Sequence, residues 1–313
     1  MQFSSFLLTL YTLASSVEAA PTTQKAAISA NAQDNFPLFM QYSGATYCDK
    51  LFSSSAPAFN CGARCGGDIA GTILTRSINN KGTEGAGYVG YNDNLNLIIV
   101  SFRGSSSTQN WINNIQIGTS TVNDWGIVTP AFLSENNRAF PGNAKQVHSG
   151  FEKTYLSIRK EIQQATQSLA VKYPNYKIVF TGHSLGGSLA TLAAADFVEN
   201  FGASFADRIS LYTYGQPRVG NREWANYIQS TPFASRMYRV QRRGDLVVHL
   251  PYQWMSYVHS GFQYTLLDDN KTIRVCKTSG PAGESDACLK DDNNILGTSV
   301  HTQYYNYNAN PCA

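Results

Sequence analysis

A chain of 313 residues, of which 42% are hydrophobic and 14% are charged, is long enough to bury a substantial core. Its formal net charge is only +3 at neutral pH, and it contains no run of basic residues. This composition argues against nucleic acid and against an acidic membrane surface as partners. After the N-terminus, no stretch approaches the roughly 20 apolar residues of a transmembrane helix, so we expect no integral membrane segment in the mature protein.

The first twenty residues predict a secretory signal peptide. Their apolar centre runs from Phe6 to Leu13, and Val17 and Ala19 have the small-residue spacing that signal peptidase reads. The alternative, a buried N-terminal helix, fits this short apolar centre less well. Residues 21–34 are polar and predict a propeptide or disordered leader, followed by one domain over residues 35–313. We therefore expect a secreted, extracellular protein, and a monomer.

Six cysteines suit an oxidising compartment, where disulfides form, but their spacing leaves the pairing open. Cys61 and Cys65 have a spacing that metals use, yet no histidine or second cysteine pair lies near them to complete a tetrahedral site. We therefore predict disulfides and no metal. The tripeptide Asn270-Lys271-Thr272 is a sequon, so Asn270 is a candidate for glycosylation.

From residue 95 onward, the hydrophobic pattern alternates between strands and helices. Residues 95–102 are almost all apolar, which is typical of a strand buried on both faces. Residues 150–172 carry apolar side chains at helical spacing and are followed by a Tyr-Pro pair, so they predict a helix. Further strands are expected at 178–181, 209–214 and 236–241. This order predicts an α/β fold with a mainly parallel central sheet flanked by helices.

The pentapeptide Gly182-His183-Ser184-Leu185-Gly186 stands between the strand at 178–181 and a stretch rich in Ala and Leu with helical character. Gly-x-Ser-x-Gly at such a junction is the nucleophile elbow of α/β-hydrolases. The turn is so sharp that its flanking positions tolerate no side chain. The N–H groups at the start of the following helix point at the reacting centre. We therefore predict an α/β-hydrolase fold with Ser184 as nucleophile.

A serine hydroxyl becomes a good nucleophile only when a histidine takes its proton and a carboxylate orients that histidine. In this fold the acid and then the histidine follow the serine along the chain. Asp245 comes directly after the strand at 236–241 and is the preferred acid. Of the downstream histidines, His301 lies in a late, glycine-containing loop and is preferred as base. His249 is too close to Asp245 in sequence, whereas His259 stays open as an alternative.

The developing oxyanion needs two N–H donors. Leu185 directly follows the nucleophile and supplies one backbone N–H. Ser105 follows the strand at 95–102 and is the candidate for the second, with Arg103 as a structural anchor of that loop.

Beyond Ser105, the side chains of Trp111, Ile112 and Ile115 share one helical face. This face either packs on the core, as in an ordinary surface helix, or forms a mobile lid over the Ser184 pocket.

With these motifs the chain resembles the fungal class 3 lipases, which are filamentous-fungal triacylglycerol lipases, and the related feruloyl esterases. The matching strings occur in the family's order: SFRGS (101–105), NWINNI (110–115), HSGF (148–151), FTGHSLGG (180–187), YGQPRVGN (214–221), YRVQRRGDLV (238–247) and the His301 segment.

The resemblance implies Ser184, Asp245 and His301 as the triad, and Ser105 and Leu185 as the oxyanion donors. It places His259 at a structural position. It also implies three disulfides, Cys48–Cys312, Cys61–Cys65 and Cys276–Cys288.

The activity that the resemblance implies is that of a secreted carboxylic-ester hydrolase, in the first place a triacylglycerol lipase acting at an oil–water interface without a cofactor. The partner would be a lipid or another ester. A feruloyl or carboxyl esterase acting on soluble esters is an alternative, as is an inactive lipid-binding relative. The apolar face at Trp111, Ile112 and Ile115 favours a lipid substrate.

Overall fold

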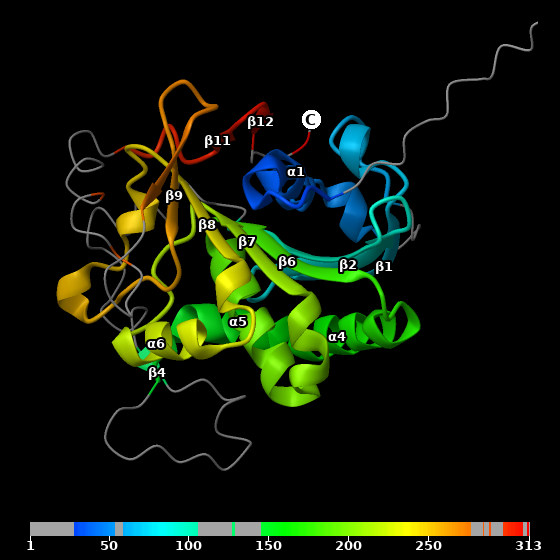
Figure 1. Ribbon diagram of the computed structural model, residues 1–313, viewed down its shortest axis with the longest axis horizontal. Helices are drawn as coiled ribbons and strands as arrows, with labels where there is room; N and C mark the ends of the chain where they lie inside the picture. Colours follow the sequence, from blue (N-terminus) through cyan, green and yellow to red (C-terminus); the bar gives the residue numbers. More distant parts are fainter. Residues whose placement is uncertain are drawn as a thin grey trace, which may run out of the picture.

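The computed structural model describes residues 28–53, 59–105, 127–128, 145–276, 284, 288, 297–308 and 312. The predicted signal peptide and the candidate lid residues Trp111, Ile112 and Ile115 lie outside these residues. Within them, an eight-stranded sheet has helices on both faces (Figure 1). None of the described helices combines the length and hydrophobicity required to cross a bilayer.

The main sheet has the strand order β1-β2-β3-β6-β7-β8-β9-β10. Strands β3, β6, β7, β8 and β9 run parallel, while β1, β2 and β10 pair antiparallel with their neighbours. Two short ladders join β4 to β5 and β11 to β12. The strands are β1 (Ile73–Asn80), β2 (Gly85–Asn92), β3 (Leu97–Phe102), β4 (Ile127–Val128), β5 (Val147–His148), β6 (Lys177–His183), β7 (Ile209–Tyr214), β8 (Met237–Arg242), β9 (Gln263–Leu266), β10 (Ile273–Cys276), β11 (Gln303–Tyr304) and β12 (Tyr307–Asn308).

Helix α1 covers one face of the sheet, and α4 and α5 cover the other (Figure 1). The α-helices are α1 (Phe36–Ala45), α4 (Ser149–Lys172), α5 (Leu185–Phe201) and α6 (Arg222–Ser230). The 3-10 helices are η1 (Ala32–Asn35), η2 (Asp49–Phe52), η3 (Gly67–Ile69), η5 (Ala203–Arg208), η6 (Ala234–Arg236), η7 (Val247–His249) and η8 (Gln253–Met255).

Two layers of core explain why the central strands are apolar throughout. In β3, Ile98 and Val100 point into the core under α4 and α5, whereas Leu97 and Ile99 point into the core under α1. Successive side chains of a strand face opposite sides, so a strand covered on both sides needs apolar residues at every position.

The predicted fold class is confirmed: the sheet is mainly parallel and flanked by helices. The strand predicted at 95–102 is β3, the helix predicted at 150–172 is α4, and the strand predicted at 209–214 is β7. In the described part of the predicted leader, the Asn31 side chain accepts a hydrogen bond from the Gln33 N–H and caps η1.

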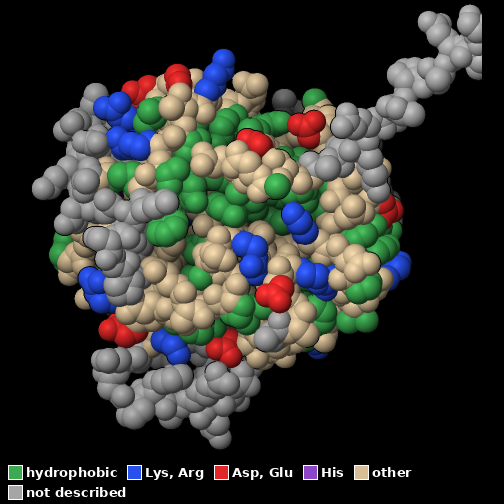
Figure 2. All heavy atoms as spheres, viewed as in Figure 1, with side chains coloured by type: hydrophobic (Ala, Val, Ile, Leu, Met, Phe, Trp, Pro, Cys, Tyr) green, Lys and Arg blue, Asp and Glu red, His purple; other side chains and the backbone are tan. Residues whose placement is uncertain are grey.

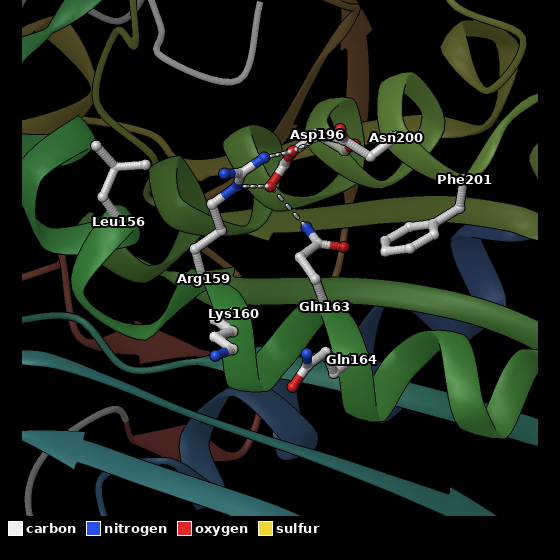
Figure 3. Close-up of a pocket in the computed structure, with 8 residues that line it drawn as sticks. All are labelled: Leu156, Arg159, Lys160, Gln163, Gln164, Asp196, Asn200 and Phe201. Atoms are coloured by element: carbon white, nitrogen blue, oxygen red, sulfur yellow. Dashed lines mark hydrogen bonds and ion pairs between the residues drawn. The ribbon is translucent and has the colours of Figure 1, made fainter. Parts of the chain in front are cut away.

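One buried carboxylate joins α4 to α5. Asp196 of α5 accepts hydrogen bonds from Arg159 Nε at 2.8 Å, Gln163 Nε2 at 3.1 Å and Asn200 Nδ2 at 2.5 Å (Figure 3). It also accepts one from the Tyr155 hydroxyl. A cavity of about 500 Å³ opens beside these side chains. It lies near the C-terminal end of α5, roughly 20 Å along the helix from its N-terminus at 1.5 Å per residue.

The charged side chains on the face drawn in Figure 2 are interspersed rather than clustered by sign. This distribution agrees with a net charge of only +3 over the whole chain.

Candidate active site

Ser184 occupies the turn between β6 and α5 with φ 58° and ψ −131°. A positive φ is strained for a residue with a side chain, and such strain concentrates at functional sites. The backbone on both sides holds the turn: the Ser184 N–H donates to Tyr214 O at 2.8 Å, and the Gly187 N–H donates to Ser184 O at 2.9 Å.

The two glycines of the motif are required by close backbone approach. A Cβ atom on Gly182 would overlap the carbonyl oxygen of Gly186, and a Cβ on Gly186 would overlap the carbonyl oxygen of Phe102. Neither obstacle can move, because both are backbone atoms in regular structure. The tight turn expected from the sequence is therefore present at this junction.

Asp245 and His301 form a fully buried pair. The His301 Nδ1 atom lies 2.8 Å from Asp245 Oδ2, and Asp245 Oδ1 accepts a hydrogen bond from the Val247 N–H at 2.9 Å. A carboxylate can only accept, so Nδ1 carries the proton in a neutral ring and Nε2 is left as the acceptor.

Backbone hydrogen bonds explain how a loop so late in the chain reaches the sheet. The Gly297 N–H donates to Gly244 O at 2.9 Å, and the Leu246 N–H donates to Gly297 O at 3.0 Å. These bonds flank Asp245, so the segment that carries His301 is fastened directly to the segment that carries the acid.

Ser184 and His301 both border the Tyr214–Gly215 turn. Ser184 is bonded to the Tyr214 carbonyl, and a Cβ on Gly215 would lie 2.8 Å from His301 Cε1. Among the residues that the structure describes, neither Ser184 Oγ nor His301 Nε2 has a hydrogen-bond partner, and both atoms are buried. They are the donor and the acceptor that a serine–histidine pair requires, and in unliganded enzymes this bond is often long.

His183 connects the elbow to the His301 backbone, a role that the sequence analysis did not assign. Its Nδ1 lies 2.8 Å from the Tyr47 hydroxyl, and its Nε2 lies 2.7 Å from His301 O. Because a carbonyl only accepts, Nε2 carries the proton and Nδ1 accepts from Tyr47. Burial and the neighbouring His301 hold the pKa of His183 well below its ordinary value, so the ring stays neutral. The one sequence feature that could have indicated this role is the position of His183 inside the pentapeptide.

Ser105 and Leu185 are both buried, on the two segments that border Ser184. Leu185 is the first residue of α5. A Cβ on Gly104 would lie 3.0 Å from Ser184 Cβ, which brings the Ser105 loop against the nucleophile candidate. Arg103 anchors this loop, since its N–H donates to Ala86 O at 2.9 Å and its Nη2 donates to Asn79 Oδ1 at 3.3 Å.

The other two downstream histidines have different surroundings. His259 Nε2 lies 2.7 Å from the carbonyl oxygen of Val248, and burial lowers the pKa of His259 well below its ordinary value. Burial, reinforced by the nearby Arg218, also lowers the pKa of His249 to about 4. Of the three downstream histidines, His301 is the one bonded to the Asp245 carboxylate.

The six cysteines form three disulfides, and these are the pairs that the family resemblance implied. The Cα–Cα distances are 4.8 Å for Cys48–Cys312, 5.2 Å for Cys61–Cys65 and 6.3 Å for Cys276–Cys288. Within the described part of the chain, no cluster of three histidine, cysteine, aspartate or glutamate side chains is placed to hold a metal ion.

The Asn270 side chain contacts the C-terminal hairpin. Its Oδ1 accepts hydrogen bonds from the Tyr305 N–H at 2.8 Å and from Arg242 Nη1 at 2.5 Å. Its Nδ2, the atom to which a glycan would be attached, donates to Tyr305 O.

The family model and the relatives that match this chain all indicate the same family. Residues 99–255, half of the chain, match the class 3 lipase model. A lipase of Rhizomucor miehei is 30% identical over 221 residues, which are 70% of this chain and 55% of the relative, so the chain spans little more than half of that protein. Secreted mono- and diacylglycerol lipase 1 of Fusarium solani is 33% identical over 261 residues, which are 80% of this chain and 71% of the relative.

The fold agrees with these sequence matches. The structure of a triacylglycerol lipase, whose catalytic centre is formed by a serine protease triad, superposes with a TM-score of 0.76 at 26% sequence identity. The superposition covers 91% of this chain and 98% of that one. The chain therefore belongs to the class 3 lipase family.

Proposed function

We propose that this protein is a secreted acylglycerol lipase, with Ser184 as nucleophile, His301 as general base and Asp245 as the acid that orients it. The observation that carries the proposal is the buried Asp245–His301 pair, 2.8 Å apart, beside a serine held at positive φ in a nucleophile elbow. The strained turn of a nucleophile elbow aims the serine oxygen at the place that an ester carbonyl takes, and the carboxylate fixes the imidazole tautomer.

In the first half-reaction, Ser184 Oγ attacks the ester carbonyl carbon while His301 Nε2 takes the hydroxyl proton. Asp245 stabilises the imidazolium that forms. The tetrahedral intermediate collapses, and His301 returns the proton to the departing alcohol, for instance a diacylglycerol. Water then attacks the acyl-enzyme by the same route and releases the fatty acid.

The negative charge of each tetrahedral intermediate falls on the former carbonyl oxygen. We assign its stabilisation to the backbone N–H groups of Leu185 and Ser105, from segments that border Ser184 on two sides. Fixed donors in a site shielded from water are worth several kcal/mol, about 3 per donor in mutational studies.

The substrate is proposed to be an acylglycerol, in the first place triacylglycerol. The solved structure of a triacylglycerol lipase that superposes over 91% of this chain supports that choice. A second candidate is hydrolysis of mono- and diacylglycerols, because the Fusarium solani relative of that name aligns over 80% of this chain. The candidate lid at Trp111, Ile112 and Ile115 is proposed as the part that selects lipid over a soluble ester.

Secretion is part of the proposal. Three disulfides are expected in a protein exposed to oxidising surroundings, and relatives from Fusarium solani and Penicillium cyclopium are named as secreted lipases.

The test compares initial rates on emulsified triolein, diolein and monoolein and on methyl ferulate, with Ser184→Ala as the inactive control. We expect hydrolysis of the acylglycerols to dominate, and loss of all activity in the control. The rate on triolein relative to that on diolein distinguishes a triacylglycerol lipase from a mono- and diacylglycerol lipase. A clear preference for methyl ferulate, without acylglycerol hydrolysis, would contradict the proposal.

A further inference from the structure

Two aromatic side chains stand out from the turn that follows the acid. Trp254 is 80% exposed and Tyr252 is 40% exposed, and their rings stack at 14° with centroids 6.1 Å apart. Among the described large hydrophobic residues, Trp254 has the highest exposed fraction. Phe262, 41% exposed, belongs to the same connection between β8 and β9. Exposed aromatic rings are unfavourable in water, and covering them with apolar material lowers the free energy.

Beyond Asp245, the segment that carries the aromatic pair has no charged side chain. Residues 246–267 contain no Asp, Glu, Lys or Arg. Their two histidines, His249 and His259, are buried, and burial lowers the pKa of both, that of His249 to about 4. The aromatic pair therefore sits in an uncharged segment of a chain whose visible surface otherwise mixes both signs (Figure 2).

Hydrogen bonds and an ion pair hold the turn that carries Tyr252 and Trp254 in place. Gln253, between the two aromatic residues, donates a hydrogen bond to Glu284. Glu284 is paired with the buried Arg218 at 2.5 Å, and Arg218 Nη1 donates to Pro251 O at 2.8 Å. The Met255 N–H donates to Tyr252 O at 3.0 Å and closes η8. Little conformational entropy is lost when a turn fixed in this way binds a partner.

The aromatic pair follows the carboxyl edge of the sheet, where the candidate active site lies. In the parallel part of the sheet, Ser184 follows β6, Gly215 follows β7 and Asp245 follows β8, so all three lie at the carboxyl edge. The chain then runs from Asp245 through η7 straight into the Tyr252–Trp254 turn, the golden segment at the left of Figure 1. A lipid surface that delivers an ester to Ser184 approaches from this edge.

We propose that Tyr252 and Trp254 are an anchor that docks the protein on an uncharged lipid surface beside its active site. The inference rests on the proposed function for the nature of that surface. Indole and phenol rings, with an apolar body and a polar tip, prefer the boundary between water and acyl chains. Because no charge takes part, binding should not require anionic lipid and should not weaken with salt.

The test measures partition of the mature protein onto vesicles of dialkyl ether phosphatidylcholine, which contains no ester for the enzyme to hydrolyse. We expect the double variant Tyr252→Ser/Trp254→Ser to bind at least about tenfold more weakly, equally at low and high salt. Trp254→Phe should keep most of the binding. The matched control is Val171→Ser, which removes a side chain 66% exposed on the last turn of α4, at the other edge of the sheet. It should bind like the wild type.

Hydrolysis of a water-soluble p-nitrophenyl ester separates docking from catalysis. The double variant should keep the wild-type kcat and KM on this ester, while its rate on emulsified acylglycerol falls in parallel with vesicle binding. Undiminished vesicle binding by the double variant would overturn the anchor. So would equal loss on the soluble ester, since the turn would then belong to the catalytic machinery.

Two further outcomes are distinguishable. Vesicle binding that depends on Trp254, in an enzyme that hydrolyses no acylglycerol, would support the anchor and contradict the proposed function. Sedimentation without lipid tests whether a second copy of this chain, rather than lipid, covers the aromatic pair. A dimer that dissociates in the double variant would overturn the lipid assignment.

Discussion

At the residue scale, the site depends on two adjacent histidine rings whose tautomers are fixed by different partners. Asp245 fixes the proton of His301 on Nδ1, and the His301 carbonyl fixes the proton of His183 on Nε2. The two rings lie 4.6 Å apart, centroid to centroid. Since burial keeps His183 neutral, the positive charge that develops during catalysis is confined to His301, next to the carboxylate.

The Tyr47 hydroxyl is therefore expected to matter for turnover although it is remote from the triad in sequence. Tyr47→Phe removes the donor to His183 Nδ1 and leaves that buried acceptor unpaired, so the ring that bonds the His301 carbonyl loses its support on the other side. We expect kcat on a soluble ester to fall about tenfold, which corresponds to about 1.4 kcal/mol, with little change in KM.

The control for this change is Tyr42→Phe. Tyr42 is a buried tyrosine of α1 that shares a hydrogen bond of 2.9 Å with Thr72, away from the two histidines. It should cost stability without changing kcat. Wild-type turnover in Tyr47→Phe would show that His183 needs no help from Tyr47.

At the element scale, α4 begins with an unusual cap. The His148 Nδ1 accepts hydrogen bonds from the N–H groups of Gly150 at 3.1 Å and Phe151 at 3.4 Å. Only the neutral ring can accept these bonds, and burial lowers the pKa of His148 to about 4. The unfolded chain binds a proton at this residue near pH 6.5, so between pH 6.5 and about 4 it holds more protons than the folded protein.

Unfolding should therefore become easier as the pH falls through this window. Full stability is present above about pH 6.5, and His148 accounts for a loss of about 3 kcal/mol by pH 4. His148→Asn keeps a side-chain acceptor at the cap and removes the titrating group. Urea unfolding at several pH values should show a shallower pH dependence in this variant. An unchanged slope would exclude His148 as the titrating group.

The carboxylate that joins α4 to α5 gives a second prediction at this scale. Asp196→Asn removes the buried carboxylate charge that pairs with the Arg159 guanidinium at 2.8 Å, and we expect the free energy of unfolding to fall by about 3 kcal/mol. The matched control is the Arg243–Asp268 pair, whose side chains are 43% and 74% exposed. Asp268→Asn should cost less than about 1 kcal/mol. If urea unfolding shows an equal decrease in the free energy of unfolding for both variants, burial does not make the Asp196 pair more important than the exposed one.

The elements that carry a local pattern could be predicted from the sequence, and those that depend on distant contacts could not. The continuous apolar run of β3 and the helical spacing of α4 are visible in a few neighbouring residues. Helix α1 is buried on almost all sides, so it has no polar face to reveal its period. The bridge from Tyr47 through His183 to His301 joins residues far apart in the chain, so only the fold brings it into view.

At the scale of the whole molecule, one disulfide ties the first helix to the end of the chain. Cys48 and Cys312 are separated by 264 residues, whereas Cys61 and Cys65 are separated by 4. A crosslink that closes a long loop restricts the unfolded chain more than one that closes a short loop, although strain can offset the difference.

We expect Cys48→Ser/Cys312→Ser to lower the free energy of unfolding by up to about 5 kcal/mol. Cys61→Ser/Cys65→Ser should cost about 2 kcal/mol or less in the same model. Urea unfolding under oxidising conditions checks both values. A larger loss in the second variant would mean that the short loop contributes through native contacts rather than through chain entropy.

The proposed mechanism requires that Ser184 is the nucleophile and that His301 activates it. The most direct measurement is peptide mapping by mass spectrometry after reaction with a p-nitrophenyl alkylphosphonate, a mimic of the tetrahedral intermediate. We predict one adduct per molecule, on the peptide that contains Ser184, with complete loss of activity and no adduct in His301→Ala. An adduct on another residue, or full activity after Ser184 is labelled, would contradict this mechanism.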